Sequence, residues 1–276
     1  MSPALFDRRC VRTGLLVAAL ASAAAQSSAD DAAKEQFLLQ ADVVRVRSAP
    51  GGVTGSLRAT LRRGSLTHDA DIQLIDESSP ERTLGSATEL DFHDSWRNNV
   101  AAYRLDRLLG LRMVPVTVVR DYDTKRAAFT WWLDDMLMTE KERYQKKQDA
   151  PDVGSWNHQV EVVRVFDQLI FNFDRNLGNL LIDRGWHIWM IDHTRSFKVF
   201  KDLRDEKQLP ASCPRGLLAA LRKLDEPGLK TRTAGLLSKG QIEGVLGRRD
   251  RIVAYYDKLI AARGRAAVLY DLPVRP

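Results

Sequence analysis

Short runs of alternating apolar and polar residues dominate the chain between residues 41 and 75. Glycine-containing turns separate three such runs, DVVRVRS at 42–48, LRATL at 57–61 and ADIQLI at 70–75. Alternation interrupted by Gly and Pro is typical of antiparallel strands joined by tight turns. We therefore predict an antiparallel meander at the start of the folded region.

The next segments predict one helix and two further strands. Residues 76–93 are polar, and we expect a loop there. Asp94 or Ser95 is suited to cap a helix, and Gly110 stands where that helix should end. Strands are expected at 113–119 and 127–133.

Helical periodicity dominates after Thr139, which forms a capping-box pattern with Glu142. Residues 157–172 carry apolar side chains around most of the helix circumference, which predicts a buried central helix. Two short apolar runs, 180–182 and 186–191, flank a tight turn and predict a hairpin.

The C-terminal part is also predicted to be helical. Ser238 and Gln241 frame one helix start, and an amphipathic stretch at 252–262 ends before Gly264. We place a boundary near 134–138, which divides the chain into a sheet-rich half at 41–135 and a helical half at 136–276.

The first 25 residues differ from the rest of the chain. Arg8, Arg9 and Arg12 precede a small-residue apolar stretch at 14–25, which ends in an A-x-A pattern. This is the layout of a cleavable export signal, and the competing interpretation is a plain N-terminal helix. The apolar run is shorter than the ~20 residues that a bilayer span needs, so no stable membrane span is expected.

We therefore predict a signal peptide at 1–25 and an N-terminal extension at 26–40. The expected location is exported, either periplasmic or extracellular, and the alternative is cytoplasmic.

Composition narrows the possible functions. The chain has 276 residues, is 44% hydrophobic and 28% charged, and carries a net charge of +6 that becomes +4 without residues 1–25. Because the charges are mixed along the chain, a dedicated nucleic-acid binder is not favoured. Cys10 would leave with the signal and Cys213 would remain alone, so no internal disulfide is expected in the mature chain. A structural zinc site is not expected, because the sequence has no CxxC, HExxH or Cys/His ligand set.

Candidate chemistry gathers in FDQLIFNFDRNLGNLLID and in WHIWMIDHTRSF, which follows it. Asp174 and Asn179 lie five residues apart, between the buried helix and the hairpin, and Asp192 ends the second hairpin strand. Phosphoryl transfer needs a carboxylate that accepts the proton of the attacking hydroxyl, and it needs oxygen ligands for the metal ions on the phosphates. The competing interpretation of the D-x-x-x-x-N spacing is an Asx-rich turn. The helix before it, the hairpin after it and the carboxylate at the hairpin's end favour the phosphoryl-transfer site.

These residues also resemble a known group of enzymes. Asp174-Arg175-Asn176 with Asn179, and DHTRSF at 192–197, are similar to the catalytic and metal-binding loops of atypical protein-kinase-like enzymes. That group includes the Golgi casein kinases, the HipA-type toxin kinases and the phosphoinositide kinases. NVAAYRLDRLLGLRMVPVTVVR at 99–120 is similar to the helix and strand of their small lobe, and the likeness covers roughly residues 40 to 200.

The resemblance implies an α+β, two-lobed, protein-kinase-like fold with an antiparallel-sheet small lobe and a mainly helical large lobe. It implies that Asp174 is the catalytic base and that Asn179 and Asp192 are metal ligands. The implied cofactors are ATP or another nucleotide triphosphate, with Mg²⁺ or Mn²⁺.

The chain departs from the family at one conserved feature of the small lobe. The family uses a strand lysine for the phosphates and a glutamate on the following helix, and the best alignment puts Gln73 and Asn99 there. The loss of the lysine and the glutamate together is physically reasonable, because either charge alone would have no oppositely charged partner. The two amides are expected to bond each other or the phosphates. The alternative is a shifted alignment register.

Two further groups are candidates for nucleotide contacts. Gly52 and Gly55 belong to a turn whose backbone N–H groups are suited to cover phosphates, and the competing interpretation is a plain hairpin turn. Arg175 is suited to steady the phosphates or the metal carboxylates, and the alternative is a structural, charge-balancing role.

Three functions follow from these patterns. The first is a metal-dependent phosphotransferase that acts on an unknown hydroxyl acceptor in a protein, lipid or sugar. The second is an exported pseudokinase that acts as a binding or regulatory protein, which the missing Lys/Glu pair would favour. The third is an exported polyanion- or envelope-binding protein, which would leave Asp174, Asn179 and Asp192 unexplained.

Overall fold

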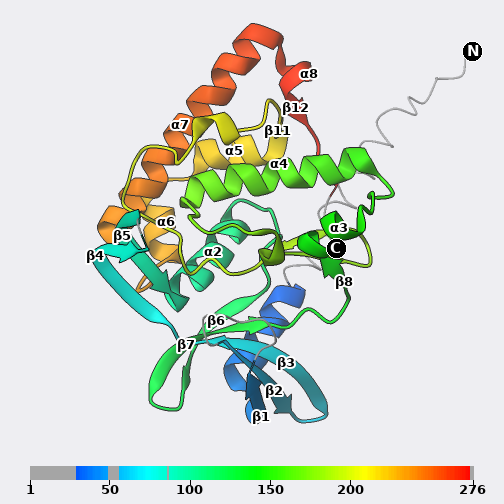
Figure 1. Ribbon diagram of the computed structural model, residues 1–276, viewed down its shortest axis with the longest axis vertical. Coiled ribbons are helices and arrows are strands. Elements are labelled where there is room, and N and C mark those ends of the chain that lie inside the picture. Colours follow the sequence, from blue (N-terminus) through cyan, green and yellow to red (C-terminus); the bar gives the residue numbers. More distant parts are fainter. Residues whose placement is uncertain (1–28, 49–55, 86, 274–276) are drawn as a thin grey trace, which may run out of the picture.

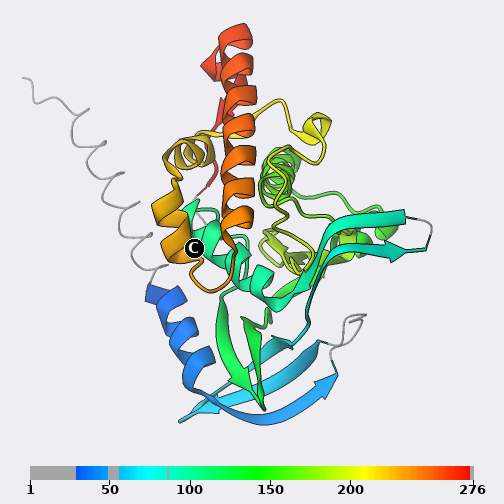
Figure 2. The ribbon, with the colours of Figure 1, turned by 90° about the vertical axis from the view of Figure 1, so that its left-hand side faces the viewer.

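The computed structural model describes residues 29–48, 56–85 and 87–273 (Figure 1). The predicted signal peptide, Cys10 and the glycines Gly52 and Gly55 lie outside the described residues. In the described part, a sheet occupies one end of the molecule and helices the other, with a helix over residues 29–40 beside the sheet (Figures 1 and 2).

The main sheet has five antiparallel strands in the order β1-β2-β3-β7-β6. Its strands are β1 Asp42–Ser48, β2 Leu57–Arg63, β3 Leu66–Gln73, β6 Thr117–Tyr122 and β7 Lys125–Trp131. The predicted meander is confirmed. The strand predicted at 113–119 begins only at Thr117, after Pro115, which has no N–H to donate to a strand partner.

The loop predicted at 76–93 is wrong, because this segment forms a hairpin arm. Its antiparallel strands are β4 Asp76–Leu84 and β5 Ala87–Ser95. Figure 2 shows the arm reaching away from the main sheet and the helices. The arm pairs only with itself, and most of its side chains with a described environment are exposed or half-buried. Such strands need no apolar face, so the alternating pattern that marks a half-buried strand is missing.

Helix α2, Trp96–Leu108, follows the arm directly. The Ser95 side chain caps it by accepting a hydrogen bond from the N–H of Arg97, and Gly110 adopts φ +69° just after its end. The predicted helix and both of its end signals are confirmed. The buried residues Val100, Ala101 and Leu105 lie on α2, which contacts β6 and β7.

The helical end contains most of the remaining elements. Its helices are α3 Glu140–Lys146, α4 Val153–Ile170, α5 Arg215–Lys223, α6 Glu226–Arg232, α7 Lys239–Arg263 and α8 Arg265–Val268, with single 3-10 turns η1 Leu177–Asn179 and η2 Glu206–Gln208. The capping boxes predicted at Thr139 and Ser238 are both present. Among the described residues, no helix has the length and apolar character that crossing a bilayer requires.

A small sheet with the order β10-β9-β8 lies between the two ends. Its strands are β8 Met136–Thr139, β9 Leu180–Asp183 and β10 Ile188–Met190, and a parallel pair, β11 Cys213–Pro214 and β12 Leu269–Tyr270, lies elsewhere among the helices. The predicted hairpin is confirmed as β9 and β10, and β8 is an additional strand that the sequence pattern did not show.

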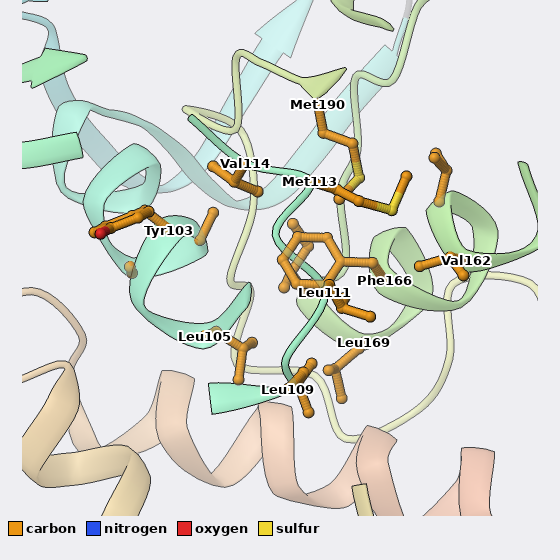
Figure 3. Packing of buried hydrophobic residues seen from close by; sticks show 14 of the residues in the cluster. Tyr103, Leu105, Leu109, Leu111, Met113, Val114, Val162, Phe166, Leu169 and Met190 are labelled. Atoms are coloured by element: carbon orange, nitrogen blue, oxygen red, sulfur yellow. The ribbon is translucent and has the colours of Figure 1, made fainter. Parts of the chain in front are cut away.

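A continuous apolar core joins the two ends of the molecule. Figure 3 shows Leu105 and Leu109 near the end of α2, Phe166 and Leu169 on α4, and Met190 on β10, all of which belong to one apolar cluster. All five side chains are buried. This packing fixes the end of α4 and the end of β10, and the candidate site residues follow these two ends in the sequence.

Candidate active site

The loop that carries Asp174 begins where α4 stops. Phe171 ends the helix in the left-handed conformation, at φ +52°. The next residue, Asn172, is buried; its side chain donates to Asp167 Oδ1 at 3.0 Å and accepts the N–H of Asp174 at 3.1 Å. The Asp174 side chain is 57% exposed, so a substrate hydroxyl can reach its carboxylate. Its Oδ2 lies 3.9 Å from Nη1 of Arg195.

The hairpin brings Asn179 and Asp192 together. Asn179 lies just before β9 and Asp192 just after β10, and the Asn179 side chain donates to Asp192 Oδ2 at 3.4 Å. Asp192 adopts φ +54°, a left-handed conformation that Asp tolerates better than most residues. Its Oδ1 accepts the hydroxyl of Thr194 at 3.0 Å. The two residues predicted as metal ligands are therefore neighbours.

Arg175 connects the Asp174 loop to this hairpin. Its guanidinium binds the Asp167 carboxylate, with Nε 3.0 Å from Oδ2 and Nη2 3.0 Å from Oδ1. Its Nη1 donates to the carbonyls of Asn179 at 3.2 Å and Ile191 at 2.8 Å. The side chain is only 11% exposed. These contacts match the structural alternative for Arg175 rather than a phosphate contact.

Gln73 and Asn99 occupy different surroundings. Gln73 is buried at the end of β3, and its Oε1 accepts the N–H groups of Leu74 at 3.1 Å and Ile75 at 3.4 Å. Asn99 lies on α2, and its Oδ1 accepts the N–H of His193 at 2.7 Å. Asn99 therefore reaches the residue next to Asp192, which links α2 to the candidate metal loop.

Asn98 is a functional candidate that the sequence patterns did not reveal. It is buried, and its side-chain NH₂ group donates to the carbonyls of Thr194 at 2.7 Å and Ser196 at 3.0 Å. The N–H of Ser95 donates to Thr194 as well, at 3.0 Å. The first turn of α2 thus holds the 192–196 loop at several backbone positions.

Two further carboxylates, those of Asp71 and Asp94, lie within electrostatic range of Asp192. Asp71 lies two residues before Gln73 on the same face of β3, and burial raises its pKa to about 6; a hydrogen bond with Ser56 opposes that shift, and the charge of Asp192 adds to it. Burial also raises the pKa of Asp94 on β5; Thr194 opposes that shift, and the charge of Asp192 again adds to it. Negative charge from two strands and the hairpin therefore accumulates around Asp192.

This arrangement fits a hard divalent cation. An amide oxygen and a carboxylate are suitable ligands for Mg²⁺ or Mn²⁺, and Mg²⁺ usually keeps its other positions for water and substrate phosphates. The excess negative charge around Asp192 also favours a cation. In the part of the chain that the structure describes, no group of three His, Cys, Asp or Glu side chains is arranged for metal binding. A metal here would therefore rest on Asn179 and Asp192 rather than on an all-protein cage.

His193 is buried between the site and the core. It makes an edge contact with Phe166, with ring centroids 6.0 Å apart, and burial lowers its pKa well below the ordinary value, with a smaller contribution from Arg175. The imidazole therefore remains neutral, as expected for a packing residue.

A buried cluster of charged side chains holds the arm against the segment after Asp192, and the sequence patterns did not predict it. Glu89 on β5 is buried, contacts Arg195, and lies 2.8 Å from Nζ of Lys198. Lys198 also donates to the carbonyls of Leu90 at 2.6 Å and Asp91 at 3.0 Å. Because residues 76–93 were expected to form a loop, no buried ion pair was predicted there.

Comparison with known proteins places the fold. No protein-family model and no curated protein matches the sequence. A solved structure of a hydra Fam20 protein with sugar matches with a TM-score of 0.66 at 15% identity, covering 86% of this chain and 91% of that one. A Golgi casein kinase matches with a TM-score of 0.63 at 18% identity, and the Golgi casein kinase with Mn/ADP bound matches with 0.63 at 17%; each comparison covers 88% of this chain and 80% of the other.

At these identities the likeness establishes the fold. The chain has the two-lobed fold of the atypical protein-kinase-like proteins, with an antiparallel-sheet lobe and a helical lobe. The resemblance inferred from the loops at 174–179 and 192–197 is therefore confirmed at the level of the fold.

Proposed function

We propose that this protein is a metal-dependent phosphotransferase that moves a phosphoryl group from a nucleotide triphosphate to a hydroxyl acceptor. The observation that carries the proposal is the pairing of Asn179 with Asp192 in a kinase-like fold. Asn179 and Asp192 would hold Mg²⁺ or Mn²⁺, which when bound would offset the negative charge of the nucleotide phosphates. Asp174, with its accessible carboxylate, would accept the proton of the acceptor hydroxyl.

We propose ATP as the nucleotide, with Mn²⁺ or Mg²⁺. A solved Golgi casein kinase of the same fold has Mn/ADP bound, and the oxygen ligands of Asn179 and Asp192 suit the same kind of cation. Asn99 would act by positioning Asp192 through His193. Gly52 and Gly55, which lie outside the described residues, remain predicted phosphate contacts on the basis of the glycine turn in the sequence.

A pseudokinase is the second candidate, and one observation favours it. The face of β3 where the family carries a lysine presents Asp71 and Gln73, and the charge of Asp71 repels that of Asp192. A carboxylate at this position disfavours polyphosphate unless cations offset it. Binding of nucleotide without turnover would identify this case.

We also propose that the protein is exported, on the basis of the basic and apolar pattern in residues 1–25. Cell fractionation with N-terminal sequencing of the mature protein tests this. A mature N-terminus close to residue 26 in the exported fraction is expected, and an intact N-terminus in the cytoplasm would favour the alternative.

Calorimetry with ATP and Mn²⁺, together with an assay of ATP consumption, tests the activity. Wild type should bind and turn over, Asp192→Ala should lose metal-dependent binding, and Asp174→Ala should bind but not turn over. Asp271→Ala is a matched control, because that carboxylate is 81% exposed and pairs with Arg215 in the helical lobe. Absence of binding in wild type, or an Asp192→Ala variant that binds like wild type, would overturn the proposal.

A further inference from the structure

A cavity of about 560 Å³ lies beside α2, and none of its described lining residues belongs to the candidate active site or contacts the 192–196 loop through its side chain. Its walls include Trp96, Tyr103 and Arg104 of α2, together with residues of β6, the segment after α6 and the helix over 29–40. The cavity is therefore separate from the candidate metal site.

Arginines dominate the charge of this cavity. Arg104 and Arg107 come from α2, Arg126 from β7 and Arg232 from the end of α6, and Glu35 is the one acidic residue among the described lining residues. The Glu35 carboxylate already accepts the hydroxyl of Tyr103 at 2.6 Å. The lining therefore carries more positive than negative charge.

Two of the four arginines have their charge matched by carboxylates. Arg107 pairs with Asp31 at 2.8 Å and contacts Asp106, and Arg126 lies 3.7 Å from Asp121. The other two do not, since no carboxylate of the described residues lies within ion-pair distance of Arg104 or Arg232. Apart from the nearby charge of Glu35, which acts on Arg104, these two arginines thus have no carboxylate paired with them in the described part of the chain.

These two arginines are close to each other. Nη1 of Arg104 donates to the carbonyl of Arg232 at 2.9 Å, which joins α2 to the end of α6. Burial lowers the pKa of Arg104, and the charge of Arg232 lowers it further, against the opposing effect of Glu35. Two like charges beside a concave space are mutually unfavourable, and an anion between them would relieve that repulsion.

We propose that this cavity binds a small ester of phosphate or sulfate, whose oxyanion is held by Arg104 and Arg232. Its volume lies within the range of small-molecule sites, roughly 300–1,000 Å³. Trp96 and Leu236 also line the cavity and provide an apolar surface for the organic part of the ester. A compact group of the size of a sugar phosphate fits this combination of charge and volume.

Calorimetry on the full chain in EDTA tests the site, because chelation keeps the proposed metal-dependent nucleotide site silent. The probes are glucose 6-phosphate and glucose 6-sulfate, with glucose as the neutral control. At least one ester should bind and glucose should not. Arg232→Gln and Arg104→Gln should each weaken binding by about tenfold or more, as expected for a hydrogen bond to a charged group.

Matched variants keep the test decisive. Arg265→Gln removes an exposed arginine elsewhere, and Asp192→Ala removes the proposed metal ligand, so both should bind the ester like wild type. Arg232 is exposed, so its variant tests the site even if Arg104→Gln proves unstable on thermal unfolding. Failure of wild type to bind either ester up to ~10 mM, or wild-type affinity in Arg232→Gln, would overturn the proposal. Because the assay is free of metal, this result is independent of the proposed phosphotransferase activity.

Discussion

The side-chain oxygen of Asn99 accepts a 2.7 Å hydrogen bond from the backbone N–H of His193, the residue that follows Asp192. The register predicted from the sequence puts Asn99 where the kinase-like family carries a glutamate that pairs with a lysine. Here the same position on α2 holds the backbone of the candidate metal loop, and Asn98 adds two hydrogen bonds to that loop. The orientation of α2 is thereby coupled to the position of Asp192 without an ion pair.

Asn99→Ala should therefore weaken metal-dependent ATP binding by about tenfold, because it frees the backbone next to Asp192 and leaves the His193 N–H without its acceptor. Asn99→Asp keeps an acceptor oxygen and should restore much of the affinity. Calorimetry with ATP and Mn²⁺ measures both effects. Wild-type affinity in Asn99→Ala would show that the loop does not depend on this bond.

Asp71 should make the stability of the protein fall as the pH rises. Burial raises its pKa to about 6 from 3.8, so the folded state holds this proton more tightly than the unfolded chain does. Its contribution is therefore fully present below pH ~4 and is lost as the pH rises through about 6. Asp71→Asn cannot ionise, and its stability relative to wild type should increase between pH 4 and pH 7 in urea unfolding.

Asp69, on the same strand, provides a control of opposite sign. Although burial opposes the shift, hydrogen bonds from Thr60 and Arg58 lower the pKa of Asp69. Its ionised form is the stabilising one, so Asp69→Asn should lose stability at neutral pH, and that loss should shrink as the pH falls through the lowered pKa. If Asp71→Asn keeps the wild-type pH profile, Asp71 is not the group responsible.

Helix α7 passes so close to the segment after the candidate metal loop that only glycine fits at one contact. A Cβ added at Gly244 would lie 2.6 Å from the carbonyl oxygen of Lys198, a backbone atom that cannot rotate away. Gly244→Ala should therefore lower the free energy of unfolding by about 1–3 kcal/mol, the usual cost of overpacking.

Gly216 on α5 is the matched control, because nothing lies within 4 Å of a Cβ added there. Gly216→Ala should leave stability unchanged or raise it by up to about 1 kcal/mol, since Ala favours the helix. Urea denaturation compares the two variants. Equal stabilities would mean that α7 shifts to accommodate the methyl group.

The predictions that were confirmed rest on sequence patterns within a single short segment. The cap at Ser95 and the hairpin after Leu180 depend on neighbouring residues, so the sequence displays them directly. The loop motif led to the correct fold, and the hairpin prediction explains why Asn179 and Asp192 meet.

Long-range features left no such signal. Glu89 contacts Arg195 and Lys198, which lie more than a hundred residues further along the chain. Asp71 and Asp192 come within electrostatic range of each other only when the two lobes fold together. Arg175 was ambiguous because its carboxylate partner, Asp167, lies one helical turn before the end of α4, where sequence gives only spacing. Such pairings depend on tertiary geometry rather than on local preference.

Glu89→Gln should destabilise the protein and release the arm. Glu89 is buried with Lys198, and its carboxylate contacts Arg195 as well, so the change leaves two cations without their shared partner. Breaking a buried ion pair on one side costs about 3–5 kcal/mol, so a loss near the lower end is expected in urea unfolding, because Arg195 is partly exposed. Hydrogen exchange of the β4 and β5 amides should accelerate.

Glu77→Gln is the matched control, because that carboxylate lies on the same arm, is 55% exposed and pairs with Arg82. Its loss should change the free energy of unfolding by less than about 1 kcal/mol. Equal effects of the two substitutions would show that the Glu89 cluster does not fasten the arm.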